Sequence, residues 1–449
     1  MMEIQKLPSD FPVEGALAAF RSRPGCVFLD SGSHDYGLGR YSILAREPSK
    51  ELTARKGAVE IRSGEKRTIR EGDPLEILRE ELGKQPRSSR ADTPFVGGAI
   101  GYIAYEAGSP RVPDPESIAL RFGFYDDAII WDHELGEVYR VVEPSIDGGG
   151  RESLSKLLAE AEAASFPSRF RVGKVSSNFA RQRYLERVET ARQRIRDGEI
   201  YQANLSQRFR ARFEGEGIAL YKRLRAANPA PYAAYLNFGD EEILSSSPER
   251  FFLLNDRIVD TRPIKGTRPR GDTGEQERQY MEELACSEKD RAELLMIVDL
   301  ERNDLGRICR AGSVRVQDLF QLERYASVIH QTGSVAGDLM PDKDAIDCIK
   351  AMFPGGSITG APKKRAMEVI DELENRERGV YTGSIGYIGF DGRADFNIAI
   401  RTMRIAKGEL SFNVGGGIVW DSVAELEYEE TLHKAKSLFE ALGVKAHGE

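Results

Sequence analysis

The stretch Pro263-Ile-Lys-Gly-Thr-Arg-Pro-Arg-Gly271 places a lysine between two cationic neighbours. Arg262 stands three residues before Lys265 and Arg268 stands three residues after it. Nearby positive charge and a dry pocket both disfavour an ammonium, so Lys265 could be partly neutral and nucleophilic near neutral pH. A solvated basic loop after a strand is the simpler interpretation of these residues alone. The rest of the sequence is needed to choose between a nucleophilic lysine and a solvated loop.

Length and composition limit the possible answers. With 449 residues, the chain exceeds the usual single-domain size, so two domains or one large composite fold are expected. The net charge of −8 argues against binding nucleic acid by phosphate neutralisation. No apolar run approaches the ~18 residues of a membrane span, and the N-terminus lacks a signal-peptide core. The four cysteines form no Cys-x-x-Cys pair, which favours reduced, packed thiols in a cytoplasmic protein: Cys26, Cys286, Cys309 and Cys348.

Strand runs and helices are segregated along the chain, which is typical of an α+β fold. In the first half we expect strands at 26–31, 39–44 and 94–105, and a hairpin over 118–142 that turns near 133–136. A helix is expected over Asp73–Leu82, with Asp73 as its N-cap. The glycine-rich start at 148–150 and the polar end near 177 predict a linker over 146–177, between an N-terminal domain (1–145) and a second domain (178–445).

The second half predicts three long helices and two groups of strands. The helices are Phe179–Asp197, Thr273–Asp299 and Ala424–Leu442, where apolar residues keep helical spacing. The first group of strands lies around Ala203 and at 232–237, 243–246, 251–255 and 258–261. The second group is a meander at 379–390, 394–405 and 410–419, with a tight turn at 391–392.

Two acidic pairs are candidates for a metal site. Asp290 and Glu293 are three residues apart on one predicted helix, and Glu427 and Glu430 are three apart on another. Each pair therefore projects from one helix face. Carboxylates at this density suit Mg²⁺, which takes few protein ligands and keeps water or substrate oxygens. A solvated acidic helix face is the alternative.

Glu249 is a candidate acid because a carboxyl group kept protonated by apolar walls can give its proton to a departing hydroxyl. It lies sixteen residues before Lys265, and we expect it on a neighbouring strand. A salt bridge from Glu249 to Arg250 or Arg262 is the alternative. The stretch Gly355–Lys363 superficially resembles a phosphate loop, but Ala361 and Pro362 replace the lysine and hydroxyl that such a loop needs. We therefore expect a structural turn there and no nucleotide site.

Several segments, in this order, give the chain its resemblance to the chorismate-utilising enzymes, the family of anthranilate, aminodeoxychorismate, isochorismate and salicylate synthases. They are Ile200-Tyr-Gln-Ala-Asn-Leu-Ser-Gln-Arg208, Ser247-Pro-Glu-Arg250, the Pro263 stretch, Asp290-Arg-Ala-Glu293, Arg302-Asn-Asp-Leu-Gly306, Gly355-Gly-Ser-Ile-Thr-Gly-Ala-Pro-Lys363, Ile400-Arg-Thr402 and Glu427-Tyr-Glu-Glu430. The resemblance implies two interleaved α/β subdomains with large antiparallel sheets around a cleft.

The resemblance also implies a role for each candidate residue. Glu249 would be the general acid, and Glu293 and Glu430 would bind Mg²⁺ directly, while Asp290 and Glu427 would act through water. Cationic side chains and backbone N–H groups are needed to hold the two carboxylates of chorismate. The candidate substrate-binding residues are Gly266, Thr267, His330, Tyr381, Arg401, Gly415, Gly416, Gly417 and Lys434.

Two positions favour one reaction within this family. Lysine at 265 is similar to aminodeoxychorismate synthases, whereas anthranilate synthases usually carry alanine there. Gln202 stands where the water-adding enzymes carry a lysine base, and a glutamine suits ammonia as the nucleophile. The resemblance thus implies amination of chorismate at C4 through a Lys265 intermediate, with a separate glutamine amidotransferase subunit supplying ammonia. Anthranilate synthesis and a catalytically inactive binding subunit are the alternatives.

A second pocket is implied by three further segments: Leu29-Asp-Ser31, Arg40-Tyr-Ser42 and Asn228-Pro-Ala-Pro-Tyr232. They resemble the tryptophan site of the family, between the N-terminal sheet and the catalytic part. The candidate residues are Ser31, Arg40, Tyr41, Ser42, Asn228, Pro229 and Tyr232. We expect the pocket to persist with weak or no feedback control, and ordinary strand and turn packing is the alternative.

Overall fold

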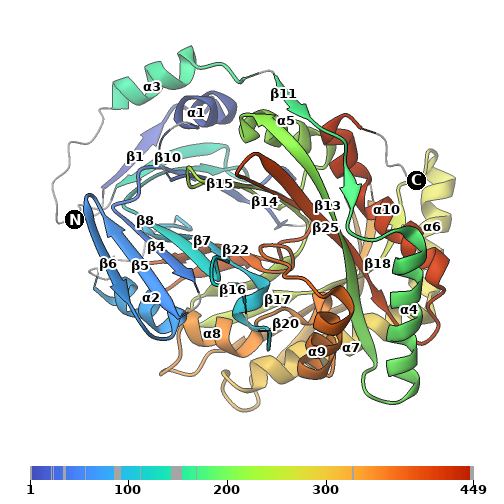
Figure 1. The fold of residues 1–449 in the computed structure, drawn as a ribbon. Coiled ribbons are helices and arrows are strands. Elements are labelled where there is room, and N and C mark those ends of the chain that lie inside the picture. The colour runs from blue at the N-terminus through green and yellow to red at the C-terminus, as the bar shows by residue number, and fades with distance from the viewer. Residues whose placement is uncertain are drawn as a thin grey trace.

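Two large antiparallel sheets dominate the computed structural model (Figure 1). It describes residues 3–444 apart from 22, 24, 34–36, 56, 85–92, 112, 143–153, 168 and 326–327. The predicted α+β class is confirmed, because strands and helices form separate layers. Among the described helices, none is both long and apolar enough to cross a membrane.

The first sheet has 13 strands. Their order is β1 (Glu3–Leu7), β10 (Glu137–Val142), β9 (Asp127–Asp132), β3 (Tyr41–Ala45), β2 (Cys26–Asp30), β14 (Tyr232–Asn237), β15 (Glu241–Ser247), β24 (Thr402–Ala406), β25 (Glu409–Ile418), β13 (Gln202–Gly215) and β11 (Phe170–Val172). The short strands β12 (Ser176–Ser177) and β21 (Gly360–Ala361) also pair with β13.

The second sheet has 12 strands. Their order is β18 (Ile264–Pro269), β20 (Val328–Asp338), β17 (Ile258–Arg262), β16 (Arg250–Asn255), β23 (Ala394–Asn397), β22 (Ser384–Gly389), β7 (Gly98–Ile103), β8 (Leu120–Tyr125), β4 (Lys50–Arg55), β5 (Ala58–Ser63) and β6 (Lys66–Arg70), and β19 (Arg315–Arg324) pairs with β20. Both sheets take strands from either side of the predicted linker.

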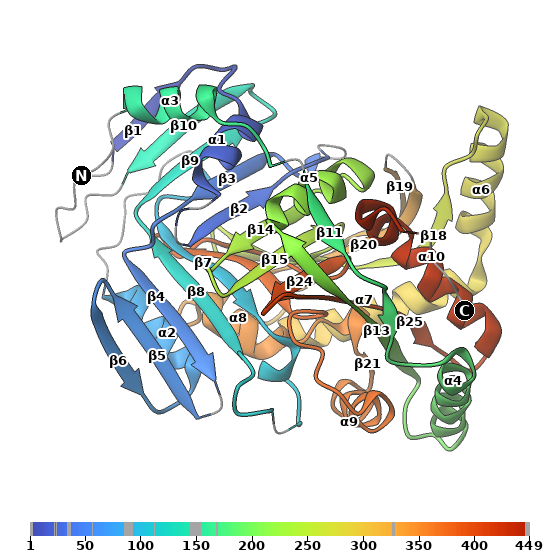
Figure 2. The same ribbon diagram turned by 45° about the horizontal axis from the view of Figure 1, so that its top comes forward.

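The helices cover the outer faces of the two sheets (Figures 1 and 2). Apolar side chains of α1 (Val13–Phe20), α3 (Leu154–Ala163), α5 (Gly217–Ala227) and α10 (Ala424–Leu442) pack on the first sheet. Those of α2 (Pro74–Gly83), α7 (Glu288–Gly306) and α8 (Ala345–Met352) pack on the second. A third apolar cluster, with Val27, Ile43, Ile100 and Tyr387, lies between the sheets. The remaining helices are α4 (Arg181–Arg196), α6 (Gly274–Cys286), α9 (Lys363–Glu374) and the short 3₁₀ turns η2 (Tyr105–Ala107) and η3 (Gly356–Ile358).

The predicted linker, 146–177, lies partly outside the described residues, since these omit 143–153 with its glycines. Its described part contains the expected alanine-rich helix, α3, which packs against α1 through Leu157 and Ala161. Strands β11 and β12 then pair with β13. The described part of this segment is therefore packed against the first sheet.

Three predicted elements are wrong in their boundaries. The segment 118–142 contains three strands, because β8 belongs to the second sheet while β9 and β10 form the hairpin of the first. The helix predicted over Thr273–Asp299 is two helices, since Ser287 is extended and its hydroxyl accepts the N–H of Asp290 at 3.2 Å. The strand predicted over 394–405 is broken before Arg401, whose φ of +48° is left-handed.

One local prediction is confirmed, and a second is confirmed for three of its four residues. Asp73 caps α2, accepting the N–H groups of Leu75 at 2.9 Å and Glu76 at 3.4 Å. All four cysteines are free, and three of them are buried, but Cys286 is exposed. Burial raises the pKa of the Cys26 thiol to about 12, as expected for a packed, unreactive group.

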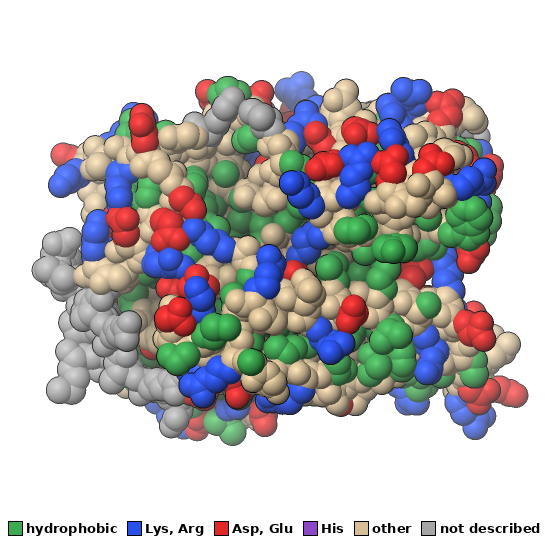
Figure 3. Space-filling model, turned by 90° about the horizontal axis from the view of Figure 1, so that it is seen from below, with side chains coloured by type: hydrophobic (Ala, Val, Ile, Leu, Met, Phe, Trp, Pro, Cys, Tyr) green, Lys and Arg blue, Asp and Glu red, His purple; other side chains and the backbone are tan. Residues whose placement is uncertain are grey.

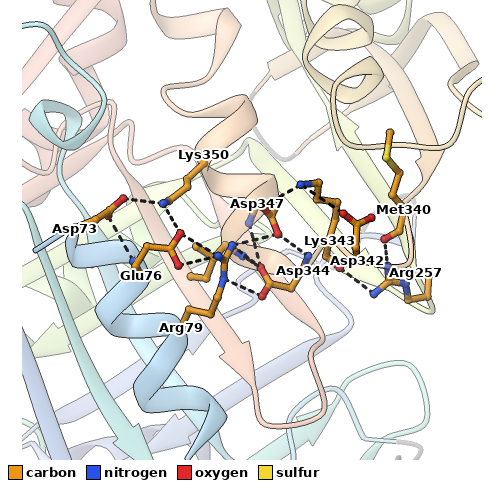
Figure 4. Close-up of polar contacts among 11 residues, drawn as sticks. Asp73, Glu76, Arg79, Arg257, Met340, Asp342, Lys343, Asp344, Asp347 and Lys350 are labelled. Atoms are coloured by element: carbon orange, nitrogen blue, oxygen red, sulfur yellow. Dashed lines mark hydrogen bonds and ion pairs between the residues drawn. The ribbon is translucent and has the colours of Figure 1, made fainter.

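Charged residues join α2 to α8 at the edge of the second sheet (Figure 4). Arg79 contacts Asp344 at 3.0 Å and Asp347 at 3.1 Å, and Lys350 reaches back to Asp73 at 2.6 Å. The network borders a cavity of about 490 Å³. Because these cations have acidic partners at the surface, the network holds two helices together with only a modest gain in stability. Figure 3 shows another face, where the described acidic and basic side chains are interspersed.

Candidate active site

A bulge in β18 sets the direction of Lys265. Ile264 is opposite Thr332 of β20 and Thr267 is opposite His330, so two residues of β18 face a single residue of β20. Gly266 in the bulge has φ +79°, and a Cβ there would lie 2.7 Å from Leu284. Glycine is therefore required by both the conformation and the space. The Lys265 ammonium donates a hydrogen bond to the carbonyl of Ser357 at 3.1 Å.

The arginines beside Lys265 do not act as predicted. Arg262 pairs with the buried Glu323, and Arg268 bonds Glu283 at 2.8 Å and Asp290 at 3.1 Å. Each arginine therefore has an acidic partner that offsets its positive charge near Lys265. Lys265 itself faces acidic groups, since its charge acts to lower the pKa of Glu249, Glu293 and Glu430. The surroundings of Lys265 are therefore not the purely cationic ones that the sequence suggested.

Glu249 lies in the short connection between β15 and β16, and not on a strand next to β18 as expected. It is 4% exposed, and its Oε1 has no hydrogen-bond partner among the described residues. Burial raises its pKa, while Ser357 and Lys265 act in the opposite sense. The alternative salt bridge is wrong, because Arg250 bonds Asp395 at 3.0 Å and Arg262 bonds Glu323. The structure therefore places a buried, unpaired carboxyl beside the lysine.

The two acidic pairs approach the same place from α7 and α10. A Cβ on Gly416 would lie 3.2 Å from Glu427 Oε2 and 3.5 Å from Glu430 Oε1, so this glycine leaves room for both carboxylates. Burial raises the pKa of Glu293 and of Glu427, and Glu430 adds to both shifts. The pKa of Glu430 is lowered, chiefly by Lys434, whose Nζ is 2.7 Å away.

These contacts distinguish the four carboxylates as metal ligands. Asp290 is already bonded to Arg268, and Glu427 accepts the hydroxyl of Ser422 at 2.6 Å. Among the described residues, the ion pairs of Glu293 and Glu430 are with lysines alone, at 4.0 Å and 2.7 Å. Over the described part of the chain, no group of three or more His, Cys, Asp or Glu side chains forms a complete metal site. Two carboxylates that leave other positions to water and substrate fit Mg²⁺.

The predicted anion-binding groups lie around this centre. Arg401 precedes β24, one residue before the paired part of the strand, and its guanidinium forms no ion pair with any described acidic residue. Lys434 reaches the carbonyl of Gly415 at 3.1 Å. Residues Gly415 to Gly417 pair with β13 on one side, while β24 pairs with β25 only up to Phe412. One edge of the glycine segment is therefore not paired with β24.

His330 is a neutral group in this site. It is 3% exposed, and Thr267 Oγ1 lies 2.9 Å from its Nδ1. Burial, with a further contribution from Arg401, lowers the pKa of the imidazole from 6.5 to about 3. Its Nε2 has no hydrogen-bond partner among the described residues, which leaves a nitrogen for a ligand. Tyr381 is also buried, and burial raises its pKa to about 12, so its hydroxyl stays protonated.

Gln202 and Ser357 lie beside these groups, and Ser357 was missed by the sequence analysis. The Gln202 side chain is fully buried, and neither atom of its amide has a described partner. A Cβ on Gly417 would lie 2.5 Å from its Nε2, so the amide points at the glycine segment. Ser357 belongs to Gly355–Lys363, where the predicted structural turn provides the carbonyl that binds Lys265. The Gly355–Lys363 motif was the signal in the sequence that could have identified Ser357.

Glu301 was also missed. It lies on the buried face of α7, eight residues after Glu293, and its Oε2 is 3.1 Å from the Thr261 hydroxyl. Burial raises its pKa well above the ordinary range, and Glu249 adds to the shift. Helical spacing from Glu293 was the available signal.

The second cavity has a volume of about 640 Å³ and lies between the two sheets. Four of the seven predicted residues line it: Ser31, Arg40, Tyr41 and Tyr232. The other three, Ser42, Asn228 and Pro229, are not among its lining residues. The Ser42 hydroxyl bonds His133 at 2.8 Å, and the Asn228 side chain bonds Ser246 and Arg401. What the cavity binds stays a prediction.

Comparison with known proteins gives one family and relatives with two different activities. The family described as chorismate binding enzyme matches residues 25–440. The chain is 40% identical over 429 residues to aminodeoxychorismate synthase component 1 of Salmonella typhimurium, covering 93% of each chain. It is 38% identical over 447 residues to anthranilate synthase component 1 of Aquifex aeolicus, covering 93% of this chain and 89% of that protein. Identity at these levels does not separate the two activities.

Solved structures agree on the fold. Anthranilate synthase component I of Streptococcus pneumoniae matches with a TM-score of 0.77 and 33% identity, covering 89% of this chain and 92% of that one. The menaquinone-specific isochorismate synthase of Escherichia coli shares the fold, with a TM-score of 0.76 at 19% identity over 98% and 94% of the two chains. With its two antiparallel sheets and its buried acid, lysine and carboxylate groups, this chain belongs to the chorismate-binding enzymes and is a chorismate-utilising enzyme.

Proposed function

We propose that this enzyme aminates chorismate at C4 with ammonia to give 4-amino-4-deoxychorismate, the precursor of 4-aminobenzoate and folate. The observation that carries the proposal is the direction of Lys265. Its Nζ lies against the Ser357 carbonyl at 3.1 Å and within electrostatic range of both Glu249 and the metal-site carboxylates. A lysine used only for surface charge would not be held among these groups by a glycine bulge.

In this proposal Lys265 is the nucleophile and Glu249 is the acid that protonates the leaving group. The Lys265 amine forms a bond to C2, both ring double bonds shift by one position, from C1=C2 to C1=C6 and from C5=C6 to C4=C5, and the C4–O bond breaks. Glu249 donates its proton to the leaving hydroxyl, which departs as water. Ammonia then forms a bond to C4, both double bonds return to their original positions, and the C2–N bond breaks, which releases the Lys265 amine. The enolpyruvyl group is retained throughout, so no pyruvate is formed.

Glu293 and Glu430 would hold Mg²⁺, with Asp290 and Glu427 acting through water. Bound there, Mg²⁺ would supply charge stabilisation for the ring carboxylate and would offset the negative charge of its own carboxylate ligands. Arg401, His330, Tyr381, Thr267 and Lys434 would hold the substrate, with the backbone of Gly266 and the glycines at 415–417. The buried amide of Gln202 supports ammonia as the nucleophile, since it provides polar atoms but no base to activate water.

A separate glutamine amidotransferase would supply the ammonia. The relatives named above are each component 1 of a synthase, which supports a second component. The described cysteines give no nucleophile for glutamine in this chain, since three are buried and Cys286 ends a surface helix.

The test is product analysis with chorismate, Mg²⁺ and an ammonium salt, followed by mass spectrometry. The proposal expects aminodeoxychorismate without pyruvate, whereas anthranilate with pyruvate would identify the alternative synthase. Without ammonia, the intact enzyme should carry an adduct of chorismate minus water on Lys265. Lys265→Arg should be as inactive as Lys265→Ala, because a guanidinium, with pKa above ~12, cannot become a neutral nucleophile. An active arginine variant with no adduct would reduce Lys265 to a binding group.

A further inference from the structure

Arg401 is held in an unusual way for a buried guanidinium. Among the described residues, its side chain has one hydrogen-bond partner, the Oδ1 of Asn228 at 3.0 Å, and no ion-pair partner. Burial lowers its pKa, and no neighbouring carboxylate offsets that effect. A guanidinium presents five N–H donors, so most of its hydrogen-bonding capacity and all of its charge remain for a ligand.

Asn228 is fixed by its own contacts. It ends α5 and is 6% exposed. Its Nδ2 donates to the carbonyl of Ser246 at 3.1 Å and to the Ser246 hydroxyl at 2.7 Å. Because a carbonyl can only accept, the nitrogen must face Ser246, and the amide oxygen must face Arg401. The Ser246 N–H also donates to the Arg401 carbonyl at 3.1 Å, so backbone and side chain of Arg401 are tied to the same pair.

We propose that Asn228 is a positioning residue that aims Arg401 at a carboxylate of the substrate while leaving its charge uncompensated. The inference rests on the substrate-binding role proposed for Arg401. It replaces the role predicted for Asn228 as a wall of the second cavity, whose lining in this segment is Pro231, Tyr232 and Ala233. A neutral amide is suited to this task, because an aspartate of the same shape would form an internal ion pair and compete with the substrate.

The test compares Asn228→Asp and Asn228→Ala with the wild-type enzyme. Asn228→Asp keeps the shape and adds a competing charge, so KM and the Kd for chorismate should rise roughly tenfold or more, with kcat within about twofold. Asn228→Ala should raise both constants less. Acidification that protonates the introduced carboxylate should bring the KM of Asn228→Asp back toward that of Asn228→Ala, while the wild-type KM shows no such recovery.

Asn237→Asp is the matched control. Asn237 bonds the Arg21 carbonyl at 2.9 Å and the Gly239 N–H at 2.8 Å, away from Arg401. The Asn237→Asp substitution should leave the KM for chorismate unchanged. If Asn228→Asp and Asn228→Ala lower only the unfolding midpoint and bind chorismate like the wild type, the positioning role is wrong. Binding measured without ammonia, with each Asn228 variant and its control made in a Lys265→Ala background so that no adduct forms, separates this outcome from the proposed reaction, since reversible chorismate binding does not depend on which product forms.

Discussion

Acid should weaken the folded enzyme through His330, one of five histidines in the chain. Burial lowers the pKa of this imidazole from 6.5 to about 3. The unfolded chain therefore binds the proton first, and stability falls as pH drops through about 6.5. Between about pH 7 and about pH 5 the unfolded imidazole takes up most of one proton and the native one almost none. This lowers the free energy of unfolding by about 2 kcal/mol.

The perturbation that isolates this effect is His330→Gln, because glutamine keeps a polar side chain but cannot titrate. Urea unfolding of both proteins at the two pH values gives the difference in free energy of unfolding at each. Every other titrating group contributes to both proteins and cancels. The advantage of the wild type over the variant should fall by about 2 kcal/mol on acidification.

The size of this effect depends little on the native pKa, as long as that pKa stays well below 5. An unchanged difference between the two proteins would refute the reasoning. So would an NMR titration in which the His330 ring gains its proton near its ordinary pKa. Either result would mean that the pocket is wet enough to solvate an imidazolium beside Arg401.

Three further predictions concern the metal, the nitrogen source and the second cavity. Glu293→Gln and Glu430→Gln should each abolish turnover and weaken Mg²⁺ and chorismate binding together, with an unchanged unfolding curve; near-normal activity at modest Mg²⁺ would return both residues to a surface role. The isolated chain should use ammonium salts, at a rate that rises with pH as free ammonia rises, and should be inert with glutamine; turnover of glutamine by the pure chain would contradict a separate amidotransferase. The cavity of about 640 Å³ should bind tryptophan with weak or no inhibition of turnover. Calorimetry without a binding signal would remove the first part, and strong inhibition the second.

Local sequence signals predicted the elements that depend on near neighbours. Asp73 followed by proline fixed the start of α2, because a cap bonds only to the next turn. The last helix, Ala424–Leu442, has the predicted bounds, since its apolar spacing is continuous. The break at Ser287 was also readable, because Ser287 and Asp290 form a cap signal, but continuous apolar spacing outweighed it in the prediction.

The pairing of strands that are far apart in the chain could not be predicted from local sequence signals. Apolar runs in 118–142 and 394–405 identify strands but not the sheet that each strand joins. The effect expected from the arginines beside Lys265 was wrong for the same reason. The arginines that flank it are close in sequence, but the carboxylate that neutralises Arg262 is 61 residues away, on β19.

The sequence by itself determined the family, the acidic pairs and the lysine, because each is a short pattern of residue types. Tertiary structure decided what those residues face. It left Glu249 without the salt bridge to Arg250 that the sequence offered as an alternative, because Arg250 bonds an aspartate 145 residues away. It turned Asn228 from the second cavity toward Arg401, 173 residues later in the chain. Charge, burial and hydrogen bonding act through space, so the chemistry of these groups depends on neighbours that no local pattern specifies.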